Sequence, residues 1–172
     1  MASEQLISTI EAYFLGERQE GLWVLLMSTL LLALAGVLWF SQRDTFARGL
    51  GIIIVLGVVV FAIASVVVVQ RSAPQKTTLV TAIESGDAAS AIATETRRMD
   101  AVMKGYPRFR AIVSVLALIG VALALFSRNG TANGVAAGFA VLFFAQTMID
   151  HYSEVRARHY LNVLQSHAAL TP

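Results

Sequence analysis

Two long runs without a charged side chain constrain the fold of this chain more than any other feature. Residues 22–40 form a run of 19, and residues 49–69 form a run of 21. A helix needs about 20 apolar residues to cross the hydrocarbon of a bilayer. Every backbone polar group must be hydrogen bonded inside that hydrocarbon, which favours helices. We therefore predict membrane-spanning helices over 22–40, anchored by Trp23 and Trp39 near its ends, and over 46–69.

Two further apolar segments predict a third and a fourth span, at 111–127 and 131–149. The third is the shortest, because only residues 111–126 are uncharged. Charged residues make up 14% of the chain, against about 25% in soluble domains. The predicted fold class is therefore all-α: a polytopic helical membrane protein, 1–172, with four transmembrane helices in two hairpins.

Three polar segments flank the predicted spans. Residues 3–16 have the period of an amphipathic helix whose polar face is acidic, so we expect that face to meet a basic protein surface, the alternative being an anionic lipid headgroup. Residues 70–110 are expected to form a helical connector, with a turn at 85–87 and a new helix starting near Pro107. Residues 150–167 are expected to continue the helix of the fourth span as a C-terminal helix, since residues 150–165 contain no Gly or Pro.

The distribution of basic residues predicts the topology. With four spans, both termini and the connector lie on one side of the membrane, and this side holds ten of the 13 Lys and Arg residues. Cytoplasmic loops carry such an excess. We therefore expect an integral protein of the bacterial inner (plasma) membrane, with cytoplasmic N- and C-termini and cytoplasmic amphipathic helices.

A faint parallel repeat relates the two halves of the sequence. Residues 10–16, IEAYFLG, align with residues 99–105, MDAVMKG, and a predicted span follows each. Duplication would give two related halves about an axis along the membrane normal. Convergence on a shared pattern of helix followed by span explains the match equally well.

A stripe of glycines at intervals of four marks the fourth predicted span: Gly130, Gly134 and Gly138. Small residues at this spacing let two helices approach closely in lipid. The stripe predicts either a subunit interface or packing within the chain. For the second alternative, Gly120 and Ala124 of the third span offer a partner surface.

The C-terminal helix carries the densest group of ionisable residues. A metal site is disfavoured there, because His151 projects away from Asp150 and Glu154 on a helical wheel. The wheel instead predicts an ordinary amphipathic helix with an ion pair between Glu154 and Arg158. The wheel groups Asp150, Glu154 and Arg158 on a polar face and Tyr152 and Tyr160 on an apolar one. The candidate partner-binding residues are Tyr152, Tyr160, Glu154 and Arg158.

Glu95 is a further candidate for partner binding. The carboxylate falls on the apolar face of the connector helix, where it needs a compensating charge. Arg98, three residues later, or a basic residue of another helix would supply it.

The remaining signals narrow the class of function. No ionisable residue lies in the interior of a predicted span, and this disfavours ion-coupled transport. No motif in the sequence predicts an enzyme, a cofactor, a metal site or nucleic-acid binding. We expect a non-catalytic structural or accessory scaffold in contact with the lipid bilayer, either a homo-oligomer or a subunit of a larger membrane complex. The alternative is an oligomeric pore lined by Ser, Thr and Gln.

Overall fold

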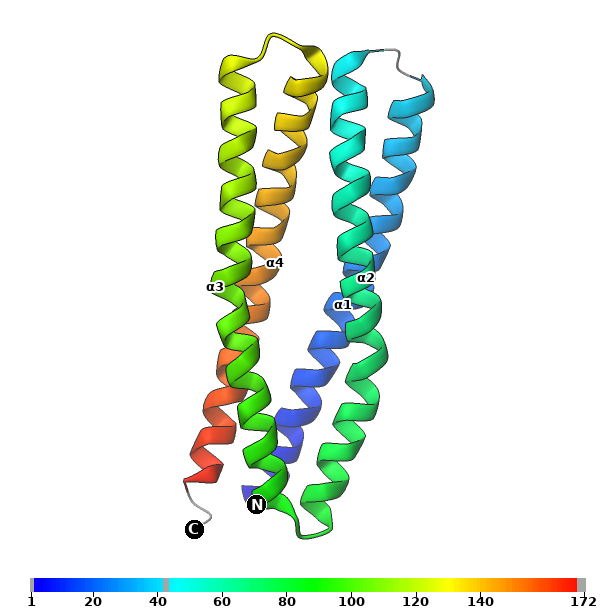
Figure 1. The fold of residues 1–172 in the computed structure, drawn as a ribbon. Helices are drawn as coiled ribbons and strands as arrows, with labels where there is room; N and C mark the ends of the chain where they lie inside the picture. Colours follow the sequence, from blue (N-terminus) through cyan, green and yellow to red (C-terminus); the bar gives the residue numbers. More distant parts are fainter. Residues whose placement is uncertain (1, 42–43, 170–172) are drawn as a thin grey trace. The chain divides into compact units, whose positions relative to one another are not determined.

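The structure, a computed structural model, describes residues 2–41 and 44–169, and over these residues it contains helices and no strand. Four helices follow one another along the chain (Figure 1): α1 (Ala2–Ser41), α2 (Thr45–Glu84), α3 (Ala88–Phe126) and α4 (Gly130–Ala168). Each is long and apolar enough to cross a membrane. The prediction of an all-helical chain with four potential spans is confirmed at this level.

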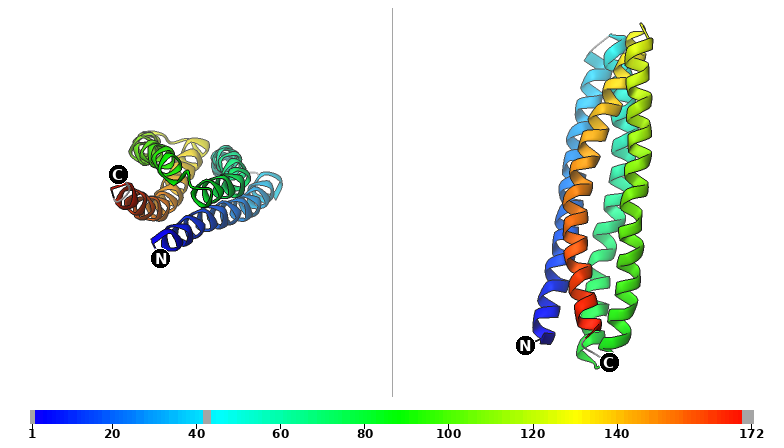
Figure 2. Two further views of the ribbon diagram at one scale, coloured as in Figure 1. Left: turned by 90° about the horizontal axis from the view of Figure 1, so that it is seen from below. Right: turned by 90° about the vertical axis from the view of Figure 1, so that its left-hand side faces the viewer.

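The helices do not stop where the sequence predicted breaks. The expected separate helix at 3–16 is the start of α1, and the expected connector is divided between α2 and α3. The expected continuation of the fourth helix through 150–167 is present in α4. Pro74 and Pro107 lie inside helices. A proline inside a helix costs about 3 kcal/mol. The helices continue past both prolines (Figure 2), and core residues pack on one side of each: Leu79 and Ile83 after Pro74, and Met99 and Tyr106 before Pro107.

Short capped connections join the helices. Gly86 lies in the turn after α2 with φ of 93°, a value that favours glycine. Asn129 caps α4, because its Oδ1 accepts a hydrogen bond of 2.8 Å from the backbone N–H of Thr131. The turn at Gly86 agrees with the turn predicted at 85–87. The connection between the first two predicted spans includes residues 42 and 43, outside the described residues.

The packing divides the chain into two compact units. The first, here called the polar unit, consists of Met1–Gly21, Val67–Pro107 and Asp150–Pro172. The second, the apolar unit, consists of Leu22–Val66 and Arg108–Ile149. The boundaries between Gly21 and Leu22 and between Ile149 and Asp150 coincide with predicted ends of the first and fourth spans.

The polar unit has a continuous core contributed by all four helices. Its buried side chains are Leu6, Ile10, Tyr13, Phe14, Leu79, Ile92, Met99, Ala157, Tyr160, Leu161 and Leu164. Aromatic rings from α1 and α4 meet at its centre. In the apolar unit a small cluster, Ala35, Ile54 and Val58, joins α1 to α2, and many large apolar side chains face outward. That outward surface suits hydrocarbon as a solvent.

Candidate functional site: the glycine contacts and the buried polar cluster

Two glycines of the apolar unit, Gly49 and Gly134, lie against backbone atoms where α2 and α4 meet. A Cβ atom placed on Gly134 would lie 2.0 Å from the carbonyl oxygen of Phe46, and one on Gly49 would lie 2.1 Å from that of Thr131. Real Cβ atoms do not approach a backbone atom so closely. At these two positions, the contact between α2 and α4 therefore depends on glycine in both helices.

The rest of the glycine stripe faces α2 as well. A Cβ on Gly130 would lie 2.2 Å from Oγ1 of Thr45, and one on Gly138 would lie 2.6 Å from Cβ of Ile53. The whole stripe is therefore filled from within the chain in this structure. Its partner is α2 and not α3, the helix that the sequence offered for this role.

The third helix uses a different face of α4. A Cβ on Gly120 would lie 3.1 Å from Cβ of Phe139 and 3.3 Å from the carbonyl oxygen of Ala136. Ala124 is exposed. Gly49 was not predicted as a contact residue, because no glycine lies four residues away from it. Its lack of a side chain was the signal that could have identified it.

A buried cluster of polar groups in the polar unit surrounds Glu95, which is 8% exposed. The Arg98 guanidinium donates two hydrogen bonds to this carboxylate, of 2.8 Å and 2.7 Å. The Tyr160 hydroxyl donates a third, of 3.0 Å, from α4. Arg98 is the partner expected at this spacing, and the bond from Tyr160 ties α4 to α3.

Tyr160 belongs to the core and is 1% exposed. Its ring stacks on that of Tyr13 with centroids 4.2 Å apart, and the Arg98 guanidinium lies over the Phe14 ring at 5.7 Å. Aromatic stacking and cation–π contacts each favour this arrangement. Since Tyr160 fills the chain's own core, its ring offers no anchor for a partner.

The two faces predicted for the C-terminal part of α4 need a correction. Asp150 is buried and Tyr152 is 66% exposed, the reverse of the wheel. The buried face is set by Ala157, Tyr160 and Leu164, which recur every three or four residues. Of the other partner-binding candidates, Glu154 and Arg158 form the predicted ion pair, at 2.6 Å.

The acidic face of α1 meets basic residues of the same chain. Glu17 pairs with Arg71 of α2 at 3.1 Å, and Glu11 pairs with Lys76 at 3.5 Å. Glu20 pairs with Arg156 of α4 at 2.5 Å. The basic surface expected opposite α1 is thus supplied by α2 and α4, and the ion pairs add to the core contacts among these three helices.

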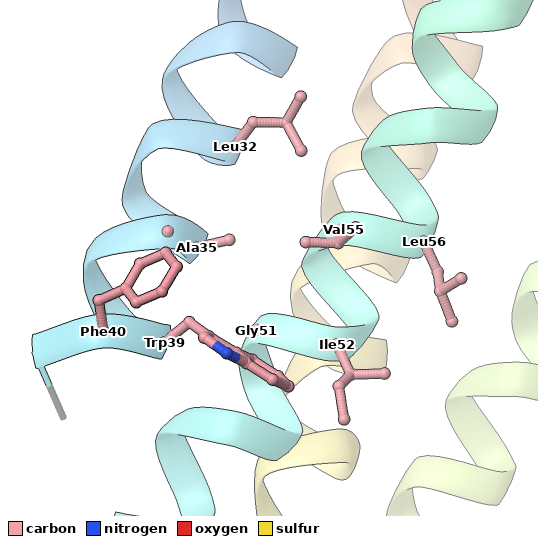
Figure 3. Close-up of a pocket in the computed structure, with 9 residues that line it drawn as sticks. Leu32, Ala35, Trp39, Phe40, Gly51, Ile52, Val55 and Leu56 are labelled. Carbon is pink, nitrogen blue, oxygen red and sulfur yellow. The ribbon is translucent and has the colours of Figure 1, made fainter. Parts of the chain in front are cut away.

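A shallow apolar groove of about 350 Å³ lies between α1 and α2 in the apolar unit (Figure 3). Leu32, Trp39 and Phe40 come from α1, and Ile52 and Leu56 come from α2. A Cβ placed on Gly36, which also lines the groove, would meet nothing within 4 Å. The groove could hold hydrocarbon. No motif in the sequence predicted it.

The buried phenols lead to a prediction for alkaline pH. Burial, and next the charge of Glu17, raises the pKa of Tyr13 to about 12. Burial, and next the charge of Glu95, raises the pKa of Tyr160. An exposed phenol has a pKa of about 10. A group whose pKa rises on folding contributes stability that is complete below about pH 10 and is lost as the pH rises through about 12.

We therefore expect the polar unit to lose its near-ultraviolet circular dichroism cooperatively above pH ~10. The tyrosinate absorbance of the buried phenols should appear in the same step, at a higher pH than that of exposed phenols. Tyr160→Phe should weaken this step, and Tyr152→Phe should leave it intact because Tyr152 is exposed. Ordinary, gradual tyrosinate formation with unchanged dichroism would contradict the expectation.

The chemistry available to these residues is mainly that of contact between helices. Among the described residues, no group of three or more His, Asp or Glu side chains could hold a metal ion. No family model, no curated protein and no solved structure matches the chain.

Proposed function

We propose that this chain is a non-catalytic integral membrane protein that self-associates and serves as a structural or accessory subunit of a membrane assembly. The apolar unit would lie in the bilayer as two helical hairpins. The polar unit, with both termini, would lie in the cytoplasm of a bacterial cell. The excess of basic residues in and next to the polar unit supports this orientation.

The observation that carries self-association is a set of large apolar side chains exposed in the polar unit. Tyr152 and Val155 on α4 are 66% and 57% exposed, and Leu15 on α1 is 56% exposed. In the bilayer such exposure would need no partner, but these residues lie outside the apolar unit. Contiguous exposed apolar patches mark interaction surfaces, and Tyr152 and Val155 are neighbours on one face of α4.

The mass of the purified particle tests the proposal. In detergent, light scattering corrected for bound detergent should give a mass of several copies of the 18.5 kDa chain. A monomer at every detergent and protein concentration would contradict self-association.

Vesicle permeability separates a scaffold from a pore. Liposomes that contain the purified protein should retain a small fluorescent ion as well as protein-free liposomes do. Release of the ion by the protein would contradict the scaffold and support a pore formed by several copies.

A further inference from the structure

The outer faces of α1 and α4 in the polar unit carry complementary residues. On α1, Glu11, Leu15 and Arg18 recur at intervals of four and three and are exposed. On α4, Tyr152, Val155 and His159 recur at intervals of three and four and are exposed. Residues at these spacings lie on one side of a helix. Each helix therefore presents one stripe that its own chain leaves uncovered.

We infer that the α1 stripe of one copy packs antiparallel against the α4 stripe of a second copy, an inference that rests on the self-association proposed above. Placing Leu15 opposite Val155 of the neighbouring copy fixes the register. The same register places Glu11 opposite the neighbour's His159 and Arg18 opposite its Tyr152. Acid then faces imidazole, apolar faces apolar, and a guanidinium faces an aromatic ring.

The acidic end of the α1 stripe fits the basic end of the α4 stripe. Glu11 retains a largely exposed side chain even though it pairs with Lys76 of its own chain. On α4, Arg158 is also largely exposed. It directly precedes His159, the residue that the register places opposite Glu11. Contact with the neighbour therefore brings the carboxylate of Glu11 near the guanidinium of Arg158.

The exposed side chains of the apolar unit are compatible with the same register. Continued along the two helices, the register places Leu22 opposite Met148 and Leu26 opposite Phe144, and all four side chains are exposed. Two copies in one membrane must also align their unit boundaries. That alignment places Leu22 opposite Ile149, one residue from the register fixed by Leu15 and Val155, or about 1.5 Å along the helix axis.

The contact joins two different faces, so in a pair of copies one keeps an unused α4 stripe and the other keeps an unused α1 stripe. Such a heterologous contact repeats from copy to copy in the plane of the membrane, and it closes into a ring where the rotation allows. The partner chemistry is thus a second copy of this chain in the same orientation.

Disulfide cross-linking tests the contact directly, because the native chain has no cysteine. Leu15→Cys and Val155→Cys are placed on chains with different tags, co-expressed and oxidised in membranes. A disulfide dimer that contains both tags is expected, and each variant expressed alone should stay monomeric on a denaturing gel. Val67→Cys, which is 51% exposed on α2, is the matched control and should form no dimer with Val155→Cys.

Other cross-linking patterns would overturn the inference. A dimer from Val155→Cys alone would indicate an α4 to α4 interface, and one from Leu15→Cys alone an α1 to α1 interface. A multimeric mass with none of these disulfides would reject the contact while preserving self-association. A monomeric mass would reject the proposed function itself.

A charge exchange adds a test that does not depend on cysteine. Glu11→Lys should lower the yield of the mixed disulfide by about fivefold, since it places a cation beside the neighbour's exposed Arg158 and an exposed charge pair contributes up to about 1 kcal/mol. His159→Glu on the neighbouring chain should restore the yield. Failure of the second change to restore it, with both chains folded by circular dichroism, would count against this register.

Discussion

Gly134→Leu is expected to destabilise the apolar unit by about 3 kcal/mol, at the upper end of the cost of overpacking. A Cβ at this position would lie 2.0 Å from the Phe46 carbonyl oxygen and 2.8 Å from the Leu50 amide nitrogen. Both atoms belong to the backbone of α2, so relief requires the two helices to move apart. Thermal unfolding in detergent, followed by tryptophan fluorescence, should therefore shift to lower temperature.

Gly36→Leu is the matched control, because a Cβ there would meet nothing within 4 Å. Both variants replace glycine with leucine, which has the higher helix propensity, so this gain is the same at both positions. Gly36→Leu should thus leave the unfolding temperature equal or raise it slightly. Equal unfolding temperatures for the two variants would contradict the tight contact between α2 and α4.

Glu95→Ala should have the second large effect, a loss of about 3–5 kcal/mol, because it leaves the charge of a partly buried guanidinium without its partner. The variant removes both hydrogen bonds from Arg98 and the one from Tyr160. The melting of the polar unit, followed by near-ultraviolet circular dichroism, measures the loss. Tyr160→Phe removes one of these bonds and should cost about 1–2 kcal/mol.

Glu154→Ala provides the comparison for Glu95→Ala. Glu154 also pairs with an arginine one turn along its helix, but Arg158 is 62% exposed. An exposed pair of this kind contributes about 0.3–0.5 kcal/mol. If the two alanine variants melted at the same temperature, the buried cluster around Glu95 would not contribute as described.

The sequence predicted well the features that depend on local chemistry. Four apolar segments follow directly from the lack of charge in each run. The pairing of Glu95 with Arg98 follows from a spacing of three residues on a helix. The turn at Gly86 follows from residue types that favour turns. Each of these depends on residues that are close in sequence.

Features that depend on distant residues were not predictable in the same way. Pro74 and Pro107 signal a break locally, but α2 and α3 continue through them, and core contacts made by Leu79 and Met99 with other helices offset part of the local cost. The glycine stripe identifies a contact face of α4 and leaves open whether α2, α3 or another copy covers it. Tyr152 and Tyr160 are chemically alike, and the core alone determines that Tyr160 is buried.

The glycine contacts between α2 and α4 also bear on how such a chain can change during evolution. Outward side chains of the apolar unit, such as Leu56 and Leu118, can drift among apolar types at little cost. Gly49 and Gly134 admit no side chain, because a backbone oxygen occupies the space at each. Descendants of this chain should therefore be related more clearly by the spacing of these glycines than by overall sequence identity.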